Sequence, residues 1–191
     1  MKKKTIALIV CLTLIIGCAV GGTIAWLTDK TATVTNTFTA GDVDIDLTET
    51  DVEGDGTLTA NSYKMVPGNT ITKDPKVTVV AGSEACWLFV KVEKSANFDT
   101  FMTYTMADGW TALTGVDGVY YREVNAETAT AGAEYPVLAQ NRVVVLDTVT
   151  KDLLNADDFV APTLEFTAYA CQKDNVSTAT DAWAKLNPVT P

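Results

Sequence analysis

Apolar and polar side chains alternate at every second residue in several stretches, and this pattern limits most strongly how the chain can fold. It runs through residues 42–47 and 163–172, while the stretch 86–93 is apolar on both faces at first and becomes polar on one face toward its end. Because successive side chains of a β-strand point to opposite faces, the alternation predicts strands with one buried face. Threonine supplies 30 of the 191 residues, and β-branched residues suit a pleated surface. We therefore expect an all-β fold, an antiparallel jelly-roll-like β-sandwich with short peripheral helices, preceded by an N-terminal signal helix.

The first 25 residues are arranged like an export signal, with basic residues first, then an apolar run, then small residues. Three lysines precede the sixteen-residue apolar run Thr5–Val20, and small residues follow it. Thr23 and Ala25 fit the −3 and −1 pockets of a signal peptidase, which would make Trp26 the first mature residue. We therefore predict a signal peptide over 1–25, cut by a dedicated signal peptidase, and a single β-sandwich domain over 26–191.

Two other fates of the leader remain open. Ile15-Ile16-Gly17-Cys18 fits a lipobox, in which the cysteine becomes lipidated, although the apolar run continues beyond it. If the apolar run is counted on through Leu27, the leader becomes long enough to remain as an uncleaved anchor. With cleavage, the protein would contact the membrane only through the leader before the cut.

Charge and composition narrow the possible functions. The mature part carries 24 acidic and 11 basic residues, a net charge of −13, which disfavours nucleic acid as a partner. The chain has no histidine, so it lacks the commonest metal ligand and the usual general base of hydrolases. We therefore expect a protein that is not an enzyme.

One acidic loop resembles the start of a calcium site. Asp51, Glu53 and Asp55 occupy every second position, and Gly56 follows at the sixth. The twelfth position is Ser62, where a bidentate glutamate would be needed, and a hairpin turn of glycine and aspartate explains the same residues. We expect no cofactor, and these three residues are the candidates if calcium binds.

Cys86 and Cys171 are the two cysteines that remain after cleavage, and both lie at ends of predicted strands. Exported proteins fold in oxidising surroundings, so we expect a disulfide between them. The alternative is a pair of buried thiols in a reducing setting.

Several motifs together resemble one family. They are Gly21-Gly22-Thr23-x-Ala25 followed by Trp26 and Thr28-Asp29, then Asn36-x-Phe38-x-Ala40-Gly41, the Pro67-Gly68 turn, and Ala182-Trp183 near the C-terminus. The chain is similar to the TasA/camelysin family of exported Gram-positive proteins, with their SipW-type signal. This resemblance implies a secreted structural subunit of an extracellular matrix or biofilm fibre, with copies of itself or family paralogues as partners. Relatives are sometimes classed as metallopeptidases, a chemistry that a chain without histidine does not supply.

Cleavage after Ala25 would release a strand that has no hairpin partner before it. Within residues 26–40 threonine alternates with other side chains, as in a strand. Such a strand can fold onto its own sheet or add to a neighbour's open edge. In the second case Trp26, Leu27, Val34 and Phe38 would fill the neighbour's groove. The alternative function is a surface-displayed binding protein for a carbohydrate or a metal ion, held by lipid or leader.

Overall fold

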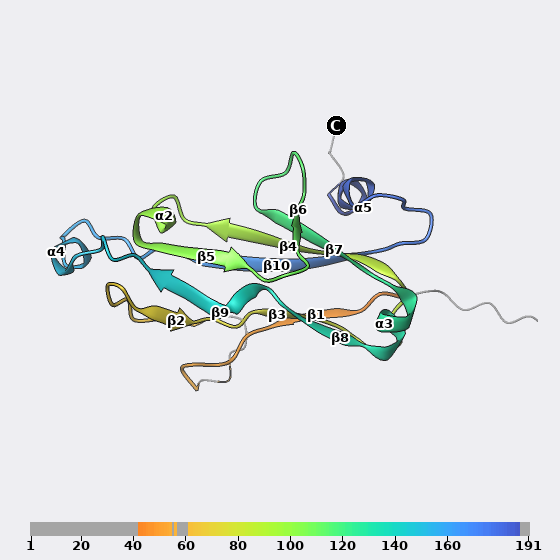
Figure 1. The fold of residues 1–191 in the computed structure, drawn as a ribbon, viewed down its shortest axis with the longest axis horizontal. Helices are drawn as coiled ribbons and strands as arrows, with labels where there is room; N and C mark the ends of the chain where they lie inside the picture. Colours follow the sequence, from red (N-terminus) through yellow and green to blue (C-terminus); the bar gives the residue numbers. More distant parts are fainter. Residues whose placement is uncertain (1–41, 55, 57–60, 188–191) are drawn as a thin grey trace, which may run out of the picture. The chain divides into compact units, whose positions relative to one another are not determined.

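Strands form most of the regular structure, as the alternating pattern predicts. The computed structural model describes residues 42–54, 56 and 61–187. In chain order the elements are β1 (Ile45–Thr48), β2 (Thr70–Thr72), β3 (Lys76–Val79), β4 (Cys86–Lys94), α2 (Phe98–Phe101), β5 (Met102–Met106), β6 (Thr111–Ala112), β7 (Val119–Val124), α3 (Ala126–Ala131), β8 (Ala133–Pro136), β9 (Leu138–Val145), α4 (Lys151–Leu154), β10 (Leu164–Gln172) and α5 (Ala179–Leu186). Figure 1 shows this arrangement.

One layer is a four-stranded antiparallel sheet in the order β10-β4-β7-β6. Its two longest strands, β4 and β10, pair along nine residues, from Leu164 opposite Lys94 to Gln172 opposite Cys86. The predicted strands at 86–93 and 163–172 are thereby confirmed. β10 forms one edge of this sheet and β6 forms the other.

The second layer contains two three-stranded sheets, β1-β3-β8 and β2-β9-β5. β2 leads directly into β3, and β8 leads directly into β9. Because β2 pairs with β9 and β3 pairs with β8, the two sheets lie one after the other along these two continuous segments. Pro75, which has no N–H to donate to a ladder, lies in the gap. Two backbone hydrogen bonds span the gap, from Lys73 N to Asn141 O and from Val137 N to Pro75 O.

After β3 the chain crosses repeatedly between the two layers. β4 lies in the first layer, β5 in the second, β6 and β7 in the first, β8 and β9 in the second, and β10 in the first. This alternation is typical of jelly rolls. The expected all-β antiparallel sandwich with short peripheral helices is confirmed.

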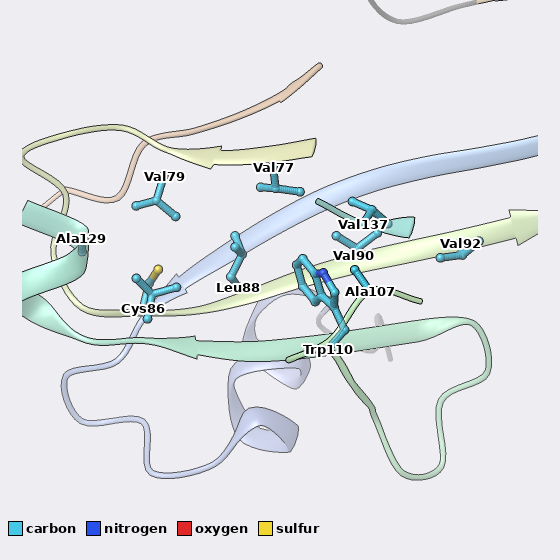
Figure 2. Packing of buried hydrophobic residues seen from close by; sticks show 11 residues of the cluster. Val77, Val79, Cys86, Leu88, Val90, Val92, Ala107, Trp110, Ala129 and Val137 are labelled. Atoms are coloured by element: carbon cyan, nitrogen blue, oxygen red, sulfur yellow. The ribbon is translucent and has the colours of Figure 1, made fainter. Parts of the chain in front are cut away.

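The main core lies between the layers and is built from one face of β4. Cys86, Leu88 and Val90 are fully buried and pack toward Val77 and Val79 of β3 (Figure 2). The opposite face of β4 carries Trp87 and Phe89, which pack under α5 in a separate cluster. The division of β4 into two faces follows from the sequence alternation.

One side of the sandwich is closed by an aromatic stack. The guanidinium of Arg122 on β7 lies 4.1 Å from the ring centroid of Tyr135 on β8 and 5.2 Å from that of Trp110. Trp110 also donates a hydrogen bond from Nε1 to the carbonyl oxygen of Pro136 at 2.9 Å. Burial holds the pKa of Arg122 below its ordinary value. These contacts join the two layers on the β7–β8 side.

One edge of the first layer is a short hairpin. Its strands are β6 and β7, which pair from Thr111 opposite Tyr121, so the connection runs over residues 113–118. Alternation could not reveal β6, because it is only two residues long and both of its side chains are exposed.

Candidate functional site

On the side of the sandwich opposite the aromatic stack, two sheet edges border one groove. β1 is the edge of its sheet and β10 is the edge of the other layer. A groove of about 870 Å³ lies there, lined by residues of β1 and β10 and by side chains from residues 61–75. Within the described part of the chain, neither β1 nor β10 has a second strand neighbour.

The groove lining is apolar and only half-buried. Inner-facing side chains of β4 are almost completely buried, whereas those of its neighbour β10 and of β1 keep part of their surface exposed. The half-buried apolar residues of the lining are Ile45, Leu47, Tyr63, Met65, Ile71, Leu164, Phe166 and Ala168. An apolar surface left uncovered between two unpaired strands is suited to receive an additional strand.

A buried ion pair interrupts this apolar lining. Lys73 Nζ lies 2.9 Å from Glu49 Oε2, and the two side chains are only 12% and 9% exposed. The hydroxyl of Tyr63 donates to Glu49 Oε1 at 2.8 Å. Burial, together with this hydrogen bond to a carboxylate, raises the pKa of Tyr63 far above its ordinary value, so the phenol stays neutral.

Aromatic rings surround the same ammonium group. Lys73 Nζ lies 5.2 Å from the ring centroid of Tyr63 and 5.6 Å from that of Phe166. Rings at this distance stabilise a cation whose water shell has been removed. The ion pair is therefore a fixed part of the groove lining.

Thr50 and Asp74 join the segment after β1 to the segment before β3. The Thr50 backbone N–H and hydroxyl donate to the Asp74 carboxylate at 3.0 and 2.6 Å. Although burial favours the protonated acid, these hydrogen bonds hold the pKa of Asp74 below its ordinary value. They fix the chain that leads from β1 to the groove.

The candidate calcium loop has a different local arrangement. The Asp51 carboxylate accepts hydrogen bonds from the backbone N–H groups of Gly54 at 2.6 Å and Gly56 at 2.7 Å. Both glycines have positive φ, so the acid closes a tight turn, in accord with the turn interpretation. Glu53 is exposed, and Asp55 lies outside the described residues.

The predicted disulfide is not formed, since Cys86 and Cys171 are both free thiols. Cys86 lies opposite Gln172, and Cys171 lies opposite Trp87. Cys86 therefore faces the main core, while Cys171 faces the α5 side of the same sheet. A bridge would require a one-residue shift of the β4–β10 register, which would turn every side chain of one strand to the other face.

Other predicted residues fall into two groups. The cleavage residues Thr23, Ala25 and Trp26, and the assembly residues Leu27, Val34 and Phe38, lie outside the described residues. The aromatics of the middle region serve as packing residues, and all of them are buried or half-buried: Phe98, Phe101, Tyr104, Trp110, Tyr120, Tyr121 and Tyr135.

Sequence reasoning missed the Glu49–Lys73 pair. The two residues are 24 positions apart and come from different strands' ends, so no local spacing relates them. The sequence did contain one signal: Glu49 and Lys73 each follow a strand segment and continue the face that carries its apolar side chains.

No helix among the described residues is long and apolar enough to cross a membrane. In residues 42–54, 56 and 61–187, no three side chains of the types Cys, Asp and Glu gather in a way that could hold a metal ion. Together with the lack of histidine in the whole chain, this described set does not fit a catalytic metal.

Comparisons with known proteins gave one match. Residues 1–83 match the model of the camelysin metallo-endopeptidase family. No curated protein and no solved structure matches the chain. The matched range includes β1, β2, β3 and both members of the Glu49–Lys73 pair.

Proposed function

We propose that this chain, which resembles the TasA/camelysin family and matches the camelysin metallo-endopeptidase model over residues 1–83, is an exported structural subunit of an extracellular matrix or biofilm fibre. In this proposal the strand of residues 26–40 from one copy enters the groove between β1 and β10 of the next copy. The observation that carries the proposal is the half-buried apolar groove between two unpaired edge strands.

The size of the groove supports this occupant. An extended strand rises about 3.4 Å per residue, so the nine residues of β10 span about 30 Å. The part of β10 that lines the groove, Leu164 to Ala168, spans about 17 Å, a length that five residues of the alternating segment 33–40 would cover. Main-chain hydrogen bonds from the donated strand would pair the free backbone groups on the edge of β10. The apolar side chains of the donated strand would cover the apolar lining of the groove.

Repetition of this contact gives a fibre. The donated strand lies at one place on the subunit and the groove at another, so the contact is heterologous and head-to-tail. Each added copy leaves one groove and one strand unused at the two ends, and growth continues without closure. The net charge of −13 on the mature chain would keep subunits apart until the specific contact forms.

The family name refers to a metallo-endopeptidase, but we propose a role without catalysis. The chain has no histidine, and the Glu49 and Asp74 carboxylates near the groove already accept hydrogen bonds from Lys73, Tyr63 and Thr50. The groove therefore offers a binding surface and no set of free metal ligands among the described residues.

A second candidate function is carbohydrate binding on the cell surface. A shallower hollow of about 690 Å³ lies over β5 and β9. Its lining includes the polar side chains Asp108, Gln140, Asn141 and Arg142. Tyr104 supplies the aromatic ring among the lining residues, and it packs edge-on against the buried Phe98, so we rank this function below fibre assembly.

Mixing two assembly-defective variants of the mature protein tests strand donation. One variant lacks residues 26–40 and so keeps the groove but loses the strand. The other carries Ala168→Trp, which fills the groove but leaves the strand intact. We expect each variant alone to stay monomeric and the mixture to form a one-to-one heterodimer, measured by light scattering after size exclusion.

Thr111→Trp on β6 is the matched control, because it places the same bulky ring on an edge strand far from the groove. This variant should still form fibres. Fibres from the deletion variant at the wild-type rate, or a mixture that stays monomeric although both variants keep their thermal unfolding transitions, would refute strand donation.

A further inference from the structure

The groove contains one polar cluster, and the N-terminal strand contains one matching polar residue. Residues 32, 34, 36, 38 and 40 share one face of an extended strand, and they are Ala, Val, Asn, Phe and Ala. The other face, residues 31–39 at odd positions, is entirely threonine. The apolar face would turn into the groove, and it would take the Asn36 side chain with it.

A buried amide requires hydrogen-bond partners, because its burial without them is costly. Lys73 has three N–H donors, and two of its hydrogen bonds go to the oxygens of Glu49 at 3.0 and 2.9 Å. Within the described part of the chain, the third donor has no acceptor. The oxygen of an asparagine amide can accept that hydrogen, and its NH₂ group can donate to the Glu49 carboxylate.

The positions of the strand ends fix the direction of a donated strand. The first described residue, Asp42, accepts a hydrogen bond from Glu84 N, at the end of the sandwich where β10 finishes. Figure 1 shows the start of β1 and the end of β10 on the same side, with α4 at the opposite end. A donated strand therefore leaves its own subunit beside the end of β10.

In a head-to-tail fibre the neighbour presents its opposite end, where β10 begins at Leu164. Residue 40 of the strand would enter there and earlier residues would lie toward Gln172, which makes the strand antiparallel to β10. A strand that folded back into its own groove would enter beside Gln172 and lie parallel to β10. The two modes thus differ in strand direction.

From these observations we propose that Asn36 of the donated strand binds the Glu49–Lys73 pair of the neighbour and thereby sets one register, antiparallel to β10, with Asn36 opposite Phe166. This inference rests on the proposed function. Lys73 Nζ lies 5.6 Å from the Phe166 ring centroid, so a residue opposite Phe166 lies beside the ion pair. A single buried polar contact in an apolar seam is an established way to fix register.

This register places apolar residues of the donated strand opposite apolar residues of β10. Phe38 lies opposite Leu164, at the end of the groove that Met65, Phe98 and Met102 line. Val34 lies opposite Ala168. Trp26 shares this face but falls beyond the end of β10, so Val34 and Phe38 carry most of the apolar contact.

Four cysteine pairs test the register on the full mature protein, in a Cys171→Ser background that removes the native thiol on β10. The matched pairs are Thr37→Cys with Glu165→Cys and Thr35→Cys with Thr167→Cys. The slipped pairs are Thr37→Cys with Thr167→Cys and Thr35→Cys with Glu165→Cys. Adjacent positions alternate between hydrogen-bonded and non-hydrogen-bonded sites, so at least one matched pair has suitable geometry.

After mild oxidation, we expect non-reducing gels to show a ladder of covalent multimers for the matched pairs and a several-fold weaker ladder for the slipped pairs. A stronger ladder from a slipped pair would overturn the register while leaving strand donation standing. An intramolecular bond, or no ladder from any of the four pairs, would overturn donation itself.

Asn36→Leu tests the polar contact without touching the folded sandwich. We expect this change to make the ladders of the slipped pairs as strong as those of the matched pairs, because an all-apolar face no longer distinguishes positions two residues apart. Thr33→Ala on the threonine face is the control and should leave the pattern unchanged. An unchanged pattern in Asn36→Leu would overturn the role of Asn36.

Discussion

The chemistry of a single residue in this sandwich depends on the strand face that it occupies. Cys86 is completely buried in the main core, and burial raises the pKa of its thiol to about 11, with the nearby Cys171 adding to the effect. Cys171 is half-buried beside α5. Two cysteines at nearly opposite positions of paired strands thus have different environments and no bond.

We predict two free thiols that react at different rates. A thiol pKa raised from 9.0 to about 11 lowers the reactive thiolate fraction about 100-fold at neutral pH, and burial slows access further. Iodoacetamide should modify Cys171 first in the native protein and both cysteines in urea without reductant, as measured by intact mass. Cys171→Ser should leave only the slow site. A native protein that takes up no label until it is reduced would instead establish the disulfide.

At the level of elements, α5 determines how the outer face of the first layer is covered. Trp183 lies 5.3 Å from the ring of Phe89 and 5.2 Å from that of Tyr169, measured between centroids. Trp87 anchors the preceding loop by donating from Nε1 to Val176 O at 3.0 Å. Thr178 caps the helix by accepting from Asp181 N at 3.1 Å. The short helix is held by tertiary contacts, since eight residues are too few for an independent helix.

We predict that Trp183→Ala destabilises the domain by about 2 kcal/mol, less than a fully buried tryptophan because this side chain is half-buried. Urea denaturation followed by circular dichroism gives the free energy of unfolding. Lys185→Ala on the same helix is the control and should change it by less than about 0.5 kcal/mol, because Lys185 is exposed. Equal stability of the Trp183 variant and the wild type would mean that α5 does not contribute to the fold.

At the level of the whole molecule, the two sides of the sandwich differ. Arg122, Trp110 and Tyr135 join the layers on one side, while β1 and β10 leave the other side open along the groove. In the proposed assembly each subunit receives one strand, in the groove on its open side. This asymmetry favours linear growth over branching.

We predict that Ala25→Trp blocks both processing and assembly in the producing cell. A bulky ring at −1 does not fit the small pocket of a signal peptidase, so the precursor should stay with the membrane fraction. Fractionation and immunoblotting should then show the full-length chain and no fibres outside the cell. Ala25→Ser, which keeps a small side chain, is the control. A mature protein that begins at lipidated Cys18 in both variants would place the chain among lipoproteins.

Much of the fold followed from the sequence, because alternation is a local property. The strands at 42–47, 86–93 and 163–172 were predicted from neighbouring residues and correspond to β1, β4 and β10. Each of these depends on side-chain period or backbone chemistry over a few positions.

The sequence by itself thus determined the strands, their buried faces and the predicted export signal. Only the tertiary structure decided which strands are neighbours, and pairing depends on contacts between residues far apart in the chain. The β4–β10 register separated Cys86 from Cys171, and the approach of residues 49 and 73 created the ion pair in the groove. The groove exists because β1 and β10 are both edge strands, a property of sheet order that no single strand's sequence carries.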